Sequence, residues 1–153
     1  MSNQVPRAVV EAFYNALSVR DMTALSAYID DQVVWTISGP VDILPFCGRR
    51  VGKAVVMKLL SRDIPTMMSI RRFVPQVMLV DGDRAAILAK LIATKSEGGR
   101  AISYRIAHFI QFRDEKVIDY VSIIDSFDAV EQMLGYNLEA YDGYRVEGNI
   151  VTV

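Results

Sequence analysis

The sequence is poor in the side chains that most metal and redox sites use. It has one histidine, His108, and one cysteine, Cys47, among 153 residues. A zinc site built from Cys and His needs several such ligands, so this class of site is excluded. No run of Asp and Glu has the spacing of a calcium loop. We therefore expect neither a metal nor a cofactor. A single cysteine forms no disulfide within the chain, which fits a reducing compartment and predicts a cytoplasmic location.

Other absences narrow the range of partners and reactions. The 17 basic and 18 acidic residues nearly cancel, which leaves no basic field for a nucleic acid. No apolar run approaches the roughly 18 to 20 residues of a membrane span. The first residues, 1–7, lack the charged and apolar regions of a signal peptide. Glycine-rich phosphate-binding motifs and a Gly-x-Ser-x-Gly elbow are also absent. We expect no nucleic-acid partner and no membrane partner.

Apolar residues are abundant and follow a helical pattern in the first half. They make up 52% of the chain, enough for the core of one domain and for an apolar cavity or subunit interface. Asp21 is suited to cap a second helix, and residues 52–60 read as a third. Between them, residues 33–37 form a strand. Apolar residues recur at helical spacing after Pro6, at Val9, Val10, Phe13, Ala16 and Leu17.

The second half changes to long β-branched runs separated by turn sequences. This pattern predicts a short helix over 126–134, ended by Gly135, after a meander of four antiparallel strands. We predict one domain over 1–135 and a tail over 136–153, for which an added edge strand is one interpretation. Helices followed by a meander indicate an α+β fold, a curved antiparallel sheet around three N-terminal helices with an internal apolar pocket. The four strands are predicted at 69–80, 84–95, 101–112 and 117–125.

Short motifs in this order resemble the nuclear-transport-factor-2-like superfamily. The closest resemblance is to its SnoaL-like polyketide cyclases and ketosteroid-isomerase-like proteins, over about residues 5 to 135. The resemblance implies a cone-shaped fold with a deep apolar pocket, a small hydrophobic ligand and a homodimer. The matching motifs are Phe13-Tyr-Asn-Ala-Leu17, Asp30-Asp31 before Val33-Val34-Trp35, Pro45-Phe-Cys-Gly48 before Gly52-Lys-Ala-Val55, His108-Phe-Ile-Gln-Phe112, Asp114-Glu-Lys-Val117 and Ile124-Asp125.

At most positions that match the catalytic residues of the isomerases, this chain has a side chain that does not suit the isomerase role. The position of the isomerase base, an Asp on the first strand, is nearest to Thr36, which accepts no proton at ordinary pH. The oxyanion-hole Tyr falls at Phe13, with Tyr14 adjacent. The oxyanion-hole Asp falls at His108. Steroid isomerisation therefore lacks most of its residues here.

The cyclase-like members fit better. They have an acid near the end of the last strand, which matches Asp125, and a His on the preceding strand, which matches His108. The epoxide-hydrolase-like members have an Arg two residues from an Asp on that strand, and Arg105-Ile-Ala-His108 does not supply it. The resemblance thus implies His108 and Asp125 as the catalytic pair.

Residue pattern leaves two interpretations for each of these side chains. His108 shares a strand face with Tyr104, Ile106 and Ile110, so it is either a core histidine bonded to backbone or a polar group on a pocket wall. Asp125 directly precedes a helix and is suited to cap it. Alternation along its strand also points it away from the pocket, unless a bulge reverses its direction.

The remaining candidates are aromatic. Trp35 is suited to pack beneath a helix, at a dimer contact or on the pocket wall. Tyr14 and Tyr104 are either pocket hydroxyls or amphipathic core residues. The predicted pocket residues are Phe13, Tyr14, Trp35, Thr36, Tyr104, Ile106 and Ile110.

Two function classes follow. The first is a cofactor-independent enzyme of the cyclase or isomerase type, which moves protons on a small hydrophobic carbonyl compound. In it, His108 or Asp125 is the base, and the other group or a Tyr hydroxyl is the donor. The second is a non-catalytic module of the same fold that binds a small ligand or dimerises.

Overall fold

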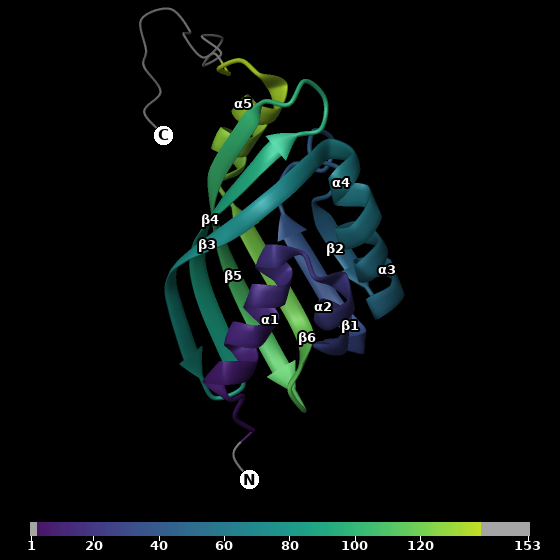
Figure 1. The fold of residues 1–153 in the computed structure, drawn as a ribbon, viewed down its shortest axis with the longest axis vertical. Helices are drawn as coiled ribbons and strands as arrows, with labels where there is room; N and C mark the ends of the chain where they lie inside the picture. Colours follow the sequence, from purple (N-terminus) through teal and green to yellow (C-terminus); the bar gives the residue numbers. More distant parts are fainter. Residues whose placement is uncertain (1–2, 139–153) are drawn as a thin grey trace, which may run out of the picture.

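The computed structural model describes residues 3–138 of the chain. Five α-helices and one π-helical turn, η1, are interleaved with the strands of one sheet (Figure 1). The helical elements are α1 (Arg7–Val19), α2 (Met22–Ala27), α3 (Lys53–Lys58), η1 (Leu59–Asp63), α4 (Ile64–Met67) and α5 (Ser126–Leu134). The strands are β1 (Ile29–Ser38), β2 (Gly48–Val51), β3 (Met68–Asp81), β4 (Arg84–Lys95), β5 (Ala101–Arg113) and β6 (Lys116–Ile124).

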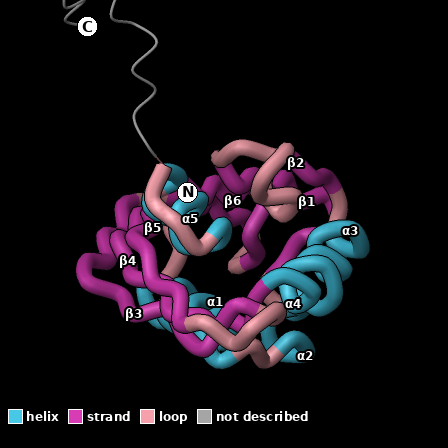
Figure 2. Tube along the Cα trace, turned by 90° about the horizontal axis from the view of Figure 1, so that it is seen from above, coloured by secondary structure: helices cyan, strands magenta, loops and turns pink. Residues whose placement is uncertain are grey.

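The sheet has six strands in the order β2-β1-β6-β5-β4-β3. Every neighbouring pair is antiparallel except β1 and β6, which run parallel. The sheet curves without closing, and α1 to α4 complete the wall on its concave side (Figure 2). This confirms the predicted α+β cone. The parallel pair arises because the first strand joins the meander at its last strand rather than at its first.

Local signals define most element boundaries. The Asp21 carboxylate accepts the N–H of Ala24 at 3.0 Å and begins α2, as predicted. Helix α5 ends at Gly135, whose φ of 85° lies in the left-handed region that glycine adopts without strain. The four meander strands agree with their predicted ranges to within one residue at every end.

Three features differ from the sequence-based prediction. Strand β1 begins at Ile29, four residues before the predicted range, and β2 was not predicted. The third helix continues past residue 60 through η1 and α4 to Met67. Pro65 lacks the N–H that a regular helix needs, and the chain adjusts with a π turn instead of ending. The edge strand suggested for 136–153 concerns residues that, apart from 136–138, lie outside the described part.

The core lies between the concave face of the sheet and the helices. Burial alternates strictly along β5, so that every second side chain from Ile102 to Phe112 points inward. His108 is one of these and is fully buried. In the described part of the chain, His108 and Ser122 are the only polar residues in the buried class. These two buried polar residues make the interior of the cone the candidate location of a functional site.

Candidate active site

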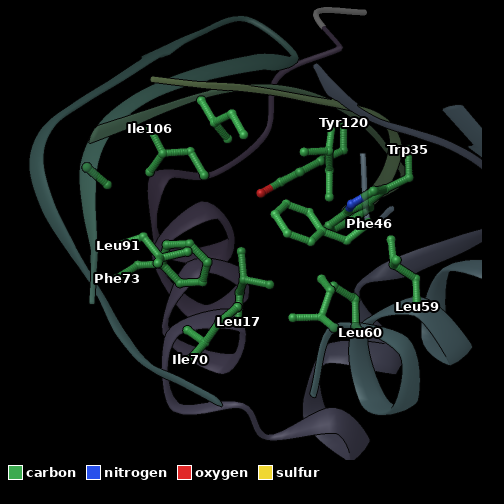
Figure 3. Close-up of a cluster of buried hydrophobic side chains, with 14 of the residues drawn as sticks. Leu17, Trp35, Phe46, Leu59, Leu60, Ile70, Phe73, Leu91, Ile106 and Tyr120 are labelled. Atoms are coloured by element: carbon green, nitrogen blue, oxygen red, sulfur yellow. The ribbon is translucent and has the colours of Figure 1, made fainter. Parts of the chain in front are cut away.

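A narrow apolar cavity lies at the centre of the cone. Its wall is built from side chains of the five strands β1, β3, β4, β5 and β6, from α1 and the η1–α4 segment, and from Phe46 of the loop before β2. Figure 3 shows Leu17, Leu60, Phe73, Ile106 and Tyr120 among the side chains that surround this space. The cavity volume is about 30 Å³. This is enough for one or two water molecules and too small for an organic ligand without movement of the wall. The deep pocket implied by the resemblance is thus nearly filled.

His108 occupies the middle of β5, opposite Ile87 of β4 and Ser122 of β6. Three aromatic rings surround its imidazole. The distances between ring centroids are 5.1 Å to Tyr120, 5.5 Å to Phe73 and 5.6 Å to Tyr14. The imidazole is therefore enclosed by rings rather than by charged groups.

Neither imidazole nitrogen of His108 has a hydrogen-bond partner within the protein. Burial lowers the pKa of His108 to about 3, so the ring is neutral at physiological pH. A neutral imidazole has one N–H donor and one bare nitrogen acceptor. A buried polar group left without a partner costs about 1–3 kcal/mol. This is not the core histidine bonded to backbone that the sequence left open, and it presents a free donor and a free acceptor to the cavity.

Other unpaired polar atoms gather around the same place. The hydroxyl of Tyr14, the hydroxyl of Ser122 and the indole N–H of Trp35 are all buried without a partner in the protein. Burial raises the pKa of Tyr14 above its ordinary value, so its hydroxyl stays protonated and able to donate. Several unsatisfied groups in one apolar region are available as hydrogen-bonding partners for a molecule with polar atoms of its own.

Arg20 is a wall residue that the sequence analysis did not identify. It follows α1 in a left-handed conformation, with φ of 59°, and its side chain lines the cavity. One guanidinium nitrogen donates to the carbonyl oxygen of Leu60, and Nη1 is buried without a partner. Burial lowers the pKa of the guanidinium below its ordinary value. The available signal in the sequence was its position three residues after the buried Leu17, a spacing at which helical side chains share a face.

Asp125 lies outside the cavity. It is exposed, and its carboxylate accepts a long hydrogen bond of 3.5 Å from the N–H of Asp128 at the start of α5. The register shift between β5 and β6 is at Gln111 and Phe112, far from this end, so no bulge turns Asp125 inward. Of the two interpretations of this residue, the structure shows the helix cap. His108 and Asp125 are not brought together.

The predicted pocket residues divide into two groups. Trp35, Tyr104 and Ile106 line the cavity beside His108. The Trp35 indole stacks on Tyr120 with 3.6 Å between ring centroids, because β1 and β6 pair these two residues in register. Tyr14 lies between His108 and a surface groove that runs along α1 and β3.

Phe13, Thr36 and Ile110 do not line the cavity, which corrects their placement in the pocket. Phe13 is buried in the core and packs edge-on against Phe112, with 6.0 Å between ring centroids. Thr36 lies on the other face of β1, since strand alternation directs Trp35 and Ile37 inward. Ile110 points inward, but nearer the far end of β5 than the cavity reaches.

Acidic and metal-binding groups are missing from this part of the interior. None of the residues on the cavity wall is Asp or Glu. Within residues 3–138, no three or more His, Cys, Asp or Glu side chains form a group suited to a metal ion. In the same range, no helix combines the length and apolar character needed to cross a membrane. The chemistry available to the cavity is that of a neutral imidazole, hydroxyl groups, an indole N–H and a guanidinium.

A curved sheet around helices, with polar groups inside an apolar cone, defines a nuclear-transport-factor-2-like protein. The family model of the SnoaL-like domain matches residues 10–120, and the chain belongs to this family. A search among functionally curated proteins gave no match.

Solved structures agree with this assignment. A protein from Rhodopseudomonas palustris, provisionally assigned as an isomerase, is 36% identical, with a TM-score of 0.72 over 82% of this chain and 93% of that one. A protein from Pseudomonas putida, provisionally assigned as a polyketide cyclase, is 21% identical, with a TM-score of 0.65 over 86% and 98%. An epoxide hydrolase from M. tuberculosis is 19% identical, with a TM-score of 0.67 over 83% of each chain. The latter two similarities concern the fold alone.

Proposed function

We propose that the protein is a cofactor-independent enzyme of the isomerase or cyclase type, acting on a small hydrophobic carbonyl compound. The observation that carries this proposal is the fully buried, neutral His108, whose two nitrogens have no protein partner inside an apolar cavity. The relative from Rhodopseudomonas palustris, itself provisionally an isomerase, supports the same reaction class.

His108 is the base in the proposed reaction. Its bare nitrogen takes a proton from the carbon beside the substrate carbonyl, and the electrons of the broken C–H bond form an enolate. In an isomerisation, the enolate recovers the proton from the imidazolium at another carbon. In a cyclisation, the enolate carbon attacks a second carbonyl carbon, and the alkoxide oxygen that forms takes the proton back from the imidazolium. The low pKa of His108 keeps it unprotonated before the reaction. The negative charge of the enolate beside the ring stabilises the imidazolium that forms.

Tyr14 is the proposed donor to the enolate oxygen. Its hydroxyl is buried, protonated and without a partner, and its ring lies 5.6 Å from that of His108. A donor fixed in apolar surroundings stabilises a developing oxyanion more than one in water does. Asp125 takes no part in this step, because it is exposed and caps α5.

Substrate binding requires the wall of the cavity to move. A volume of about 30 Å³ is far below the few hundred that small-molecule sites occupy. The η1–α4 segment contributes Leu60 and Ile64 to this wall, and π turns are irregular points in a helix that often lie at functional sites. We propose that this segment moves outward to admit the substrate, which then binds a less populated open state.

The alternative function is a non-catalytic module that binds a small ligand. The observation that favours it is the nearly filled cavity, together with the absence of an acid beside His108. This module would use the same unpaired groups to hold a ligand without proton transfer.

A homodimer is also proposed, through the convex face of the sheet. Leu79, Ala86, Phe109 and Val121 form a row across β3, β4, β5 and β6 in register. Leu79 is 63% exposed and Phe109 50% exposed. A second copy would remove this apolar row from water.

Exchange of carbon-bound protons tests the enzyme without knowledge of its product. The protein is incubated in D₂O with a panel of apolar ketones, with and without a carboxylate group, and deuterium incorporation is followed by NMR. We expect exchange beside the carbonyl of at least one compound, and none above background with H108Q. A folded H108Q that exchanges at the wild-type rate would overturn the role of His108. If the wild type binds panel members without any exchange, the binding module is correct.

A further inference from the structure

The cavity wall carries a positive charge that the protein does not neutralise. Arg20 forms no ion pair among the residues that the structure describes, and no Asp or Glu lines the cavity. Its Nη1 is buried without a hydrogen-bond partner. The other side chains on the wall are mostly apolar, among them Leu17, Leu60 and Met68. A guanidinium in such surroundings loses hydration, and its one hydrogen bond to the Leu60 carbonyl oxygen leaves its charge unpaired.

The fold holds this guanidinium in place through a main-chain carbonyl. The N–H of Ile64 bonds to the oxygen of Leu59, and Pro65 has no N–H to offer. The carbonyl oxygen of Leu60 therefore lacks its helical donor and accepts from Arg20 instead. This bond occupies Nη2 and fixes the orientation of the guanidinium relative to η1, while Nη1 stays available. The irregular helix thus positions a cation on the wall.

The chemistry of this group selects its ligand. A guanidinium presents a planar set of donors that matches a carboxylate, and a charged partner gives a stronger hydrogen bond than a neutral one. The apolar wall selects a molecule whose remaining surface is hydrophobic. We infer that the ligand of this cavity is a small apolar carboxylic acid, held as its carboxylate by Arg20. This inference rests on the proposed function only in assuming that the cavity opens to a ligand.

The inference also narrows the substrate of the proposed reaction. His108 and Arg20 line the same cavity and offer different groups, a neutral imidazole and a fixed cation. With the carboxylate at Arg20, the carbonyl end of the molecule extends along the apolar wall toward His108. The substrate class is therefore an apolar oxo acid, with Arg20 as the residue that determines specificity for its acid group.

Matched pairs of acids and alcohols test this inference. Hexanoate, octanoate and phenylacetate are compared with hexanol, octanol and 2-phenylethanol by calorimetric titration near neutral pH. We expect wild-type protein to bind at least one acid about 10-fold or more tightly than its alcohol, as a charge-assisted hydrogen bond implies. In R20M the preference disappears while the affinity for the alcohol is unchanged. R20K retains part of the preference, because it keeps the charge without the planar set of donors.

Controls separate loss of the cation from loss of the fold. R20Q keeps an amide N–H for the Leu60 oxygen and removes the charge, so it replaces R20M if R20M melts early. Retention of the acid preference in folded R20M or R20Q overturns the inference, and so does a wild type that prefers no acid. Acid binding that depends on Arg20, with full proton exchange in H108Q, would disprove the proposed function and leave this inference intact.

Discussion

The rings of Tyr14 and His108 lie 5.6 Å apart, and neither the hydroxyl nor the imidazole has a hydrogen-bond partner in the protein. Helix α1 supplies one ring and strand β5 the other. A folded protein normally pairs its buried polar groups, since each unpaired group costs about 1–3 kcal/mol. These two adjacent unpaired groups, His108 on the cavity wall and Tyr14 beside it, fit the proposed ligand, which would pair with both.

Removing the Tyr14 hydroxyl tests its role as donor. We expect Y14F to exchange substrate protons about 100-fold more slowly, as for loss of one oxyanion donor. Its melting temperature should stay the same or rise, because the ring is kept and an unpaired hydroxyl is removed. Y104F is the matched control, since the Tyr104 hydroxyl lies against the Met68 sulfur at 4.0 Å. Equal exchange rates in Y14F and wild type would contradict the assignment.

The buried imidazole predicts how stability depends on pH. The pKa of His108 is about 3 in the folded protein, against about 6.5 for an exposed histidine. Between these values the unfolded chain binds a proton that the folded protein excludes. The contribution of the neutral His108 to the free energy of unfolding is therefore fully present above pH 6.5, and it is lost as the pH falls toward 3. The slope approaches about 1.4 kcal/mol per pH unit within this window.

Urea unfolding of wild type and H108Q at pH 4.5 to 7 measures this dependence. Carboxylates titrate in both proteins, so the difference between the two slopes isolates the histidine. We expect the H108Q slope to be shallower by about 1 kcal/mol per pH unit. Parallel slopes would show that His108 becomes protonated without opening the fold.

Substitution of Asp125 separates capping from catalysis. D125A should lower the free energy of unfolding by about 0.5–2 kcal/mol, because the N–H of Asp128 loses its acceptor. D125N is the matched control, because Asn caps a helix about as well as Asp and carries no charge. We expect both variants to keep the wild-type exchange rate, measured by NMR at a temperature where they are folded. Loss of exchange in D125N would restore Asp125 as a catalytic acid.

The apolar row on the convex face predicts the oligomeric state. Light scattering should give a dimer for the wild type and a monomer for F109K, because a lysine at the centre of the row would be buried against the second copy. V55K is a control with a similarly exposed apolar residue, 48%, on α3. A wild type that remains monomeric at the highest protein concentration measured would argue against this interface. A dimeric F109K would do the same.

The direction of His108 could be predicted from its strand. Inward and outward side chains alternate without interruption over residues 101–112. Because a period of two follows from the geometry of an extended backbone, the inward-facing residues could be predicted from the sequence. The cap at Asp125 was readable for a similar reason, since the carboxylate and the N–H that it accepts lie three residues apart. Such local features depend on the chain within a few residues of each site.

The contents of the cavity were decided by tertiary structure. Trp35 meets Tyr120 only because β1 pairs with β6, and Arg20 meets the Leu60 carbonyl only because the fold brings the end of α1 near η1. The cavity volume of about 30 Å³ is the small space that remains where side chains of many elements meet. Sequence determined the fold class and the inward position of a lone histidine, because periodic patterns follow from local backbone geometry. Its partners and the room around it depend on packing between segments far apart in the chain, which no local pattern specifies.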